Sequence, residues 1–243
     1  MKIFKTTALL LALCIIISLC GCAKPDKNFG VPKTESKAET QKSVAFDDNK
    51  ITSLDSVMSK YFDITQFDEE NYSNIYLGAD YKLNAVYCNK KFVFPAKVSD
   101  LKKDGWNFVD DSDYDENSLI YAKETTEVVF SDKYSNTITA LFYNSLNTSV
   151  RLADCSIVKF HIKNNHIKNP DSYSTFNVNG ITNSSVVTDI FEVLGTPSHF
   201  YKKSENSYYF DYFFEKSDRR NKIRVYANLN YDVVTEVEFS NYK

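Results

Sequence analysis

The sequence predicts an α+β fold of two weakly repeated halves, each with short helices packed on an antiparallel β-meander. The first observation is a period of two beyond Asn74, in β-branched and aromatic runs bounded by Asn, Asp and Ser, which is typical of strands. The second is a pair of short helical runs, each entered by an extended aromatic segment and followed by Gly. The expected strands are Leu83–Tyr87, Glu127–Phe130, Thr137–Tyr143, Cys155–Ile162, Ser207–Phe214, Lys222–Asn228 and Asp232–Phe239.

The amino terminus predicts export from the cytoplasm. Lys2 and Lys5 precede an apolar run from Ala8 to Leu19, and small residues follow it, which is the pattern of a signal peptide. The alternative is an anchor that stays in the membrane. A span needs about 20 apolar residues, and this run is shorter, so the sequence favours a cleaved signal.

Leu19, Gly21 and Cys22 resemble the lipobox of bacterial lipoproteins, with Leu three places and Gly one place before the cysteine. The resemblance implies cleavage between Gly21 and Cys22 and a diacylglyceryl group on the Cys22 thiol. At about 0.8 kcal/mol per buried methylene, two acyl chains supply a gross attraction on the order of 20 kcal/mol. Membrane lipid at Cys22 is thus one predicted partner, and the protein is expected on the extracytoplasmic side of the cell membrane.

Composition divides the rest of the chain. Residues 22–50 are polar and charged with almost no large apolar residue, so a disordered tether is expected there, after a signal peptide at 1–21. A first α+β domain is expected at 51–165 and a second at 172–243. Residues 1–21 hold two lysines and no acid, so the mature chain would carry a net charge of −5 instead of −3. That mild acidity argues against a nucleic-acid partner.

The helical runs have predicted boundaries. One lies within Val98–Trp106 and the other at Ser184–Leu194, each with a Ser near its start as the expected N-cap. Gly195 is expected to hold a left-handed conformation where the second helix ends, and Pro197 prevents its continuation. A further short amphipathic helix is expected at residues 54–62, where apolar residues recur at helical spacing.

The second half resembles a known family through Gly180-Ile181-Thr182, Leu194-Gly195-Thr196-Pro197 and the strands that follow. It is similar to the small-protein-A type of outer-membrane assembly lipoprotein, whose tandem-repeat relatives include the β-lactamase inhibitory proteins. The resemblance implies a helical pair packed on an antiparallel sheet and a role in binding other proteins without catalysis.

No catalytic constellation is found in the sequence, and no enzyme activity, cofactor or metal is predicted. The histidines His161, His166 and His199 lack Cys or Glu at ligand spacing, so turn or surface positions are expected for them. Cys88 and Cys155 would form either a disulfide or two buried thiols, and their apolar surroundings favour thiols.

An acidic run resembles the start of a calcium loop. Asp111, Asp113 and Asp115 match the first three ligand positions, but Glu116 and Ala122 stand where such a loop requires Gly and Glu. A solvated loop is expected, with a weak calcium site as the alternative.

The aromatic strand near residue 210 is the candidate partner-binding surface. Alternation places one set of side chains on one face and Tyr209, Asp211 and Phe213 on the other. One set would be buried, and the other would stay open to a partner unless both faces are covered. The candidate partner-binding residues are Tyr208, Phe210, Tyr212 and Phe214.

The sequence therefore predicts a membrane-anchored extracytoplasmic lipoprotein that binds an unknown protein and is not an enzyme. One alternative is a surface receptor for a small ligand or a glycan. The other is a secreted hydrolase of unfamiliar type, which would need a cluster of titratable groups in a cleft.

Overall fold

The computed structural model describes residues 57–165 and 174–242, which belong to one compact unit formed by residues 47–243. The predicted signal peptide, the Cys22 lipobox, the tether and His166 lie outside the described residues. No helix in the described part of the chain is long and apolar enough to cross a membrane.

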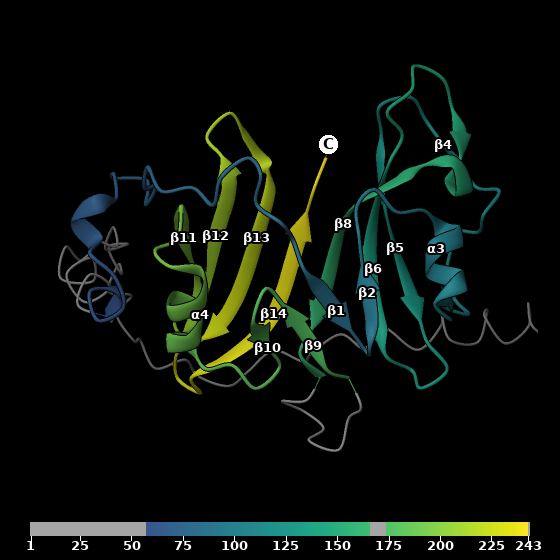
Figure 1. The fold of residues 1–243 in the computed structure, drawn as a ribbon. Coiled ribbons are helices and arrows are strands. Elements are labelled where there is room, and N and C mark those ends of the chain that lie inside the picture. The colour runs from purple at the N-terminus through teal and green to yellow at the C-terminus, as the bar shows by residue number, and fades with distance from the viewer. Residues whose placement is uncertain (1–56, 166–173, 243) are drawn as a thin grey trace, which may run out of the picture. The chain divides into compact units, whose positions relative to one another are not determined.

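An eight-stranded antiparallel sheet dominates this unit (Figure 1). Its strand order is β11-β12-β13-β14-β8-β6-β5-β3, so each half of the chain supplies one end of the sheet. The strands are β3 (Asn107–Phe108), β5 (Thr125–Ser131), β6 (Thr137–Tyr143), β8 (Ser156–Lys163), β11 (His199–Ser204), β12 (Ser207–Glu215), β13 (Asp218–Asn228) and β14 (Val233–Ser240).

The two halves meet at the pairing of β14 with β8. The register sets Phe239 opposite Phe160 on the core face and Glu238 opposite His161 on the other face. The segments predicted as separate domains, 51–165 and 172–243, each contribute four strands to this one sheet. In both segments a hairpin and a helix come before those four strands.

A second, four-stranded sheet covers the centre of the large one. It consists of β1 (Ala85–Tyr87), β2 (Lys90–Phe92), β9 (Phe176–Val178) and β10 (Ile181–Thr182), in the order β10-β9-β1-β2. A separate two-stranded sheet pairs β4 (Leu119–Ile120) with β7 (Val150–Arg151). The small four-stranded sheet thus joins hairpins from both halves, through the pairing of β1 with β9.

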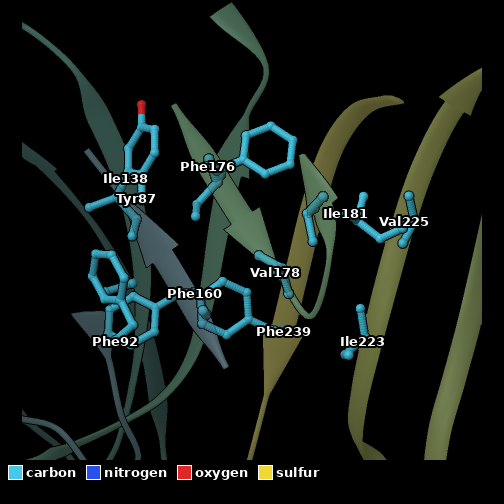
Figure 2. Close-up of a cluster of buried hydrophobic side chains, with 14 of the residues drawn as sticks. Tyr87, Phe92, Ile138, Phe160, Phe176, Val178, Ile181, Ile223, Val225 and Phe239 are labelled. Atoms are coloured by element: carbon cyan, nitrogen blue, oxygen red, sulfur yellow. The ribbon is translucent and has the colours of Figure 1, made fainter. Parts of the chain in front are cut away.

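The core lies between the four-stranded and eight-stranded sheets (Figure 2). Phe92 from β2 packs against Phe160 of β8, with ring centroids 4.6 Å apart, and also contacts Phe239 of β14. Tyr87 of β1 stacks on Trp106, which lies just before β3. Burial of a large apolar side chain contributes about 1.5–3 kcal/mol, so these contacts stabilise the packing of one sheet on the other.

The predicted α+β class is wrong, because this is a β-rich fold. The α-helices that lie wholly within the described residues are α3 (Val98–Lys103) and α4 (Val187–Leu194), beside the short 3-10 turns η1 (Ile64–Gln66) and η2 (Leu152–Asp154). Val57 and Met58, where the description begins, are also helical. Where a helix layer was expected, the small four-stranded sheet covers the core. Of the strands of this sheet, only β1 lies in an expected strand. The others have two or three residues, too few to show a period of two clearly, so the second sheet was not recognised from the sequence.

Both helices begin without the predicted Ser cap. Their N-cap residues are Lys97 and Val186, whose backbone N–H groups donate to the carboxylates of Asp100 and Asp189, each at 2.9 Å. These carboxylates satisfy N–H groups at the helix starts and suit the positive end of the helix dipole. The helix positions are close to those predicted, but acidic residues inside the first turn take the role expected of Ser.

The longer strands confirm the predictions from alternation. All seven expected strands are present, with boundaries shifted by a few residues at most of their ends. Cys155 is buried and Cys88 half-buried, and both are free thiols, which agrees with the favoured alternative.

The segment before β1 runs along the β11 edge of the large sheet. Met58 and Phe62, from the expected amphipathic stretch, are buried in the core, although residues 54–56 are not described. Further along, Tyr72 forms a bridge with His199 of β11, and the N–H of Leu77 donates to the carbonyl of Phe213. This segment therefore brings side chains of the first half to the far end of the second half.

We predict that Gly195→Ala lowers the free energy of unfolding by about 1–3 kcal/mol, the usual cost of a non-Gly residue in a glycine-only conformation. Gly195 ends α4 at φ 77° and ψ −158°, so the predicted positive φ is present, but its ψ lies outside the left-handed helical region. A Cβ there would meet no atom within 4 Å, so the effect should come from the backbone alone.

Urea denaturation would measure this change, with Glu192→Ala at an exposed position of the same helix as the control. Equal stability of the two variants would contradict the assignment of backbone strain to Gly195.

Candidate functional site

The candidate partner-binding residues Tyr208, Phe210, Tyr212 and Phe214 line the core and are at most 3% exposed. As a partner-binding set this prediction is wrong, because the small sheet and α4 cover the face from which these side chains project. Phe210, for example, packs edge-on against Phe191 of α4, with ring centroids 5.0 Å apart. The alternate residues of β12 point to the opposite face.

We call that opposite face of the large sheet the polar face. Its side chains come from five adjacent strands and form cross-strand rows, because the register aligns them. One row runs through His199, Asp211, Arg224, Glu238 and His161. A second runs through Tyr201, Tyr209, Tyr226, Glu236 and Lys163. A third runs through Phe213, Lys222, Ser240 and Lys159.

Asp211 is the centre of the polar face and is only 2% exposed. Arg224 on the neighbouring strand donates to both of its carboxylate oxygens, with Nε–Oδ1 at 2.5 Å and Nη2–Oδ2 at 2.7 Å. Lys222 lies 3.8 Å from the same carboxylate, and His199 Nδ1 lies 3.4 Å from it. A bidentate pair of this kind fixes the orientation of both side chains.

The electrostatics of this cluster favour the charged carboxylate. Burial by itself would raise the pKa of Asp211, but hydrogen bonds from Arg224 and His199 and the charge of Lys222 outweigh it, so the pKa is lowered. Burial would lower the pKa of Arg224, but the bond to Asp211 and its negative charge raise it. Burial lowers the pKa of Lys222 more than Asp211 raises it. The cluster therefore holds one carboxylate among several cationic groups.

Aromatic rings surround the Asp211–Arg224 pair. The Arg224 guanidinium lies over the ring of Tyr209, 4.0 Å from its centroid. Tyr209 in turn stacks on Tyr201 and meets Tyr226 edge-on, with centroids 5.2 and 5.7 Å apart. Stacking on a ring restricts a guanidinium without neutralising it.

Arg219 is a second stacked arginine on the polar face. Its guanidinium lies 4.1 Å from the centroid of the Tyr72 ring and 5.8 Å from that of Phe213. Tyr72 also stacks on His199, with centroids 4.2 Å apart, so the contacts continue to Asp211. In the described part of the chain no carboxylate pairs with Arg219. This guanidinium is therefore held in place by rings and is available to an external anion.

The rest of the polar face is balanced in charge. Lys159 bridges Glu127 and Glu238, at 2.9 and 3.5 Å, across β5, β8 and β14. His161 Nε2 lies 2.7 Å from Glu236 Oε2, and this hydrogen bond is the main reason that the pKa of Glu236 is lowered. The excess of positive charge is thus confined to the end of the face formed by β12 and β13.

Other residues singled out in the sequence lie elsewhere. Asp115 accepts hydrogen bonds from Asn117 N and Ser118 N and Oγ, so it shapes a turn rather than facing Asp111 and Asp113 across a calcium site. Among the described residues, no three His, Cys, Asp or Glu side chains gather as metal ligands. Turn or surface positions were expected for the histidines. His161 and His199 are strand residues paired with carboxylates; His161 is half-buried on the polar face, whereas His199 is buried.

Sequence reasoning missed Tyr72 and the cations of β13. Nothing near Tyr72 in the sequence connects it to His199, which lies 127 positions further along. The residues of β13 offered a weak signal, since Lys222, Arg224 and Tyr226 alternate with Ile223 and Val225 on a predicted strand. That alternation indicates a polar face, although not its partners.

Comparison of the chain with protein-family models, with curated proteins and with solved structures finds no match. The resemblances to bacterial lipoproteins and to the small-protein-A type therefore stay predictions.

We predict that Asp211→Asn lowers the free energy of unfolding by about 3–5 kcal/mol, because it leaves the buried charge of Arg224 without its counter-ion. Glu127→Gln is the matched control, since Glu127 is 56% exposed on the same face and its pair with Lys159 is open to solvent. The control should cost no more than about 1 kcal/mol. Urea denaturation of both variants at neutral pH measures the difference, and a loss of similar size in the two would contradict a central role for Asp211.

Proposed function

We propose that this protein is a membrane-anchored extracytoplasmic lipoprotein that binds an acidic segment of another extracytoplasmic protein and performs no catalysis. The anchor is the Cys22 diacylglyceryl group inferred from the lipobox, followed by a tether up to residue 50. The binding surface is the positive end of the polar face. The observation that supports it best is the Arg219 guanidinium, stacked between rings without a carboxylate partner in the described part of the chain.

Charge and burial support a protein partner with carboxylates. Lys222 and Arg224 contact the Asp211 carboxylate. The Arg219 guanidinium and the Lys222 ammonium both lie by the Phe213 ring, 5.8 and 5.9 Å from its centroid, so positive charge gathers at this end of the polar face. Arginine and tyrosine are the residue types most enriched where protein interfaces gain affinity. Because these side chains are already ordered by stacking, a partner would lose little free energy in ordering them.

The alternatives have less support on this face. A glycan receptor would need open ring faces, but Tyr209 already stacks on Tyr201 and carries the Arg224 guanidinium. A hydrolase would need a nucleophile beside a histidine that a carboxylate orients. His161 has such a carboxylate in Glu236, 2.7 Å away, and His199 contacts Asp211 at 3.4 Å, but no described Ser, Thr or Cys side chain hydrogen-bonds to either ring. Asp211 is moreover paired with Arg224 and Lys222.

We predict that Cys22→Ala abolishes lipid attachment, so that the protein leaves the membrane fraction or accumulates as an uncleaved precursor. Cys155→Ala is the control, since Cys155 is a buried thiol of the sheet region and should leave processing and membrane fractionation unchanged. Metabolic labelling with a radioactive fatty acid and fractionation of cells would measure both properties. Label and membrane association that persist in Cys22→Ala would contradict the anchor.

The binding surface is tested by site-specific photo-cross-linking in native cells. A benzophenone amino acid at Tyr201, which is 50% exposed on the polar face, should capture one discrete partner. The same probe at Tyr121, 66% exposed next to β4, should not. Arg219→Glu should reduce the Tyr201 product about tenfold or more through charge repulsion, whereas Arg151→Glu, with the same change of charge on β7, should not.

The identity of the captured protein then decides the proposal. A partner whose cross-linked peptide is rich in Asp and Glu supports it. A product that is equal at both probe positions, or that is unaffected by Arg219→Glu, contradicts it.

A further inference from the structure

A hollow of about 1020 Å³ lies in the first half of the chain, apart from the polar face. Its walls come from four segments distant in sequence: the β1–β2 turn, the residues after α3, the β5–β6 turn and Thr175 before β9. Ligand sites of proteins have volumes of about 300–1,000 Å³, so the hollow is large enough for a small organic molecule.

Positive charge predominates among its titratable side chains. Lys90, Lys103 and Lys133 line the hollow, and none of these ammonium groups has an ion pair with a described residue. The acidic lining residues are Asp104 and Asp132. Three cationic groups therefore face two carboxylates.

The carboxylate of Asp132 is already engaged in its own turn. Its Oδ1 accepts the N–H groups of Tyr134 and Asn136 at 2.8 and 2.9 Å, and its Oδ2 accepts the side-chain amide of Asn136 at 2.8 Å. These bonds use most of its accepting capacity, so it competes weakly for the lysines. The half-buried carboxylate of Asp104 has no ion pair with a described residue, so the three lysines have one available carboxylate between them.

The wall also contains a buried donor without an acceptor. Trp106 lines the hollow, is 1% exposed, and its indole Nε1–H has no hydrogen-bond partner among residues 57–165 and 174–242. A buried donor left unsatisfied is costly, but this nitrogen is enclosed by the surrounding side chains and does not face the hollow openly. The ring of Trp106 is stacked on Tyr87 and almost fully buried, so the aromatic surface open to the hollow comes from Tyr134, which lines it and is 63% exposed.

Cys88 adds a neutral group rather than a nucleophile. Burial and the nearby charge of Asp132 raise the pKa of Cys88 to about 11, so the thiol stays protonated at neutral pH. The hollow is therefore suited to binding rather than to nucleophilic attack, and its lining combines three lysines, two carboxylates and the exposed ring of Tyr134.

We propose that this hollow binds a small planar organic acid, whose acidic group lies among Lys90, Lys103 and Lys133 and whose ring packs on the side chain of Tyr134. The ligand would be recognised by its negative charge together with its apolar plane, and neither property alone suffices. This site is independent of the proposed partner surface.

The chain contains a built-in reporter, since Trp106 is its only tryptophan. The probe is 8-anilinonaphthalene-1-sulfonate, an aromatic anion with a planar naphthalene ring that accepts energy from an excited indole. N-phenyl-1-naphthylamine has the same rings without the sulfonate and is the uncharged counterpart. Titration of the full chain with each dye, with quenching of Trp106 emission as the signal, separates the role of charge from that of the rings.

We predict saturable binding of the sulfonate dye at one site, and about tenfold weaker binding by Lys103→Gln/Lys133→Gln, since two attractive charges are removed. Lys103→Arg/Lys133→Arg should restore the affinity. The control is Lys82→Gln/Lys91→Gln, which removes two exposed lysines that do not line the hollow and should change nothing. Equal thermal midpoints for these variants show that folding is unaffected.

Two results would overturn the proposal. One is equal affinity of the wild-type chain for the sulfonate dye and for the uncharged dye. The other is an unchanged affinity for the sulfonate dye in Lys103→Gln/Lys133→Gln.

Discussion

The pairing of β14 with β8 is the constraint on which the rest of the structure depends. Five residue pairs, from Glu236 with Lys163 to Ser240 with Lys159, join the strands of the two halves into one sheet. On one face this register places Phe239 next to Phe160, where both meet Phe92 of the small sheet. On the other it places Glu238 beside His161 and near Lys159. A slip by one residue would exchange the two faces, so the core and the polar face have a common origin.

The polar face is an inefficient way to stabilise a fold. Removing Asp211 and Arg224 from water costs several kcal/mol per ion, and their attraction offsets this only with good geometry. Apolar residues of similar volume at these two positions would stabilise the fold equally well. A sheet that needed only to fold could therefore leave this face simply polar and exposed, as many antiparallel sheets do. The ordered charges are better explained by recognition than by stability.

The sequence predicted the fold where structure is local and failed where it is not. Long strands such as Thr137–Tyr143 show their period of two directly, and Gly195 shows where α4 ends. The class was wrong because strands of two or three residues, such as Lys90–Phe92 and Ile181–Thr182, show too little of a period to be told from loops. Alternation correctly separated the side chains on the two faces of β12, but the face predicted to bind a partner is the one buried in the core. Only the tertiary structure brings Tyr72 and Arg219 together.

The two arginines of the polar face differ in a way that bears on binding. Arg224 is both stacked on a ring and saturated by Asp211, so its charge is already compensated. Arg219 is stacked in the same manner on Tyr72 but has no carboxylate partner among the described residues.

The orientation of Arg219 is thus set by aromatic rings, while its N–H groups remain available to an acceptor. A carboxylate that approaches it gains a bidentate contact without the loss of side-chain freedom that a flexible arginine would suffer. The negative charge of Asp211 repels such a carboxylate only weakly, because Arg224 and Lys222 lie against Asp211 and screen its charge. The cations that compensate the buried charge of Asp211 therefore also make the surface above it favourable for an acidic partner.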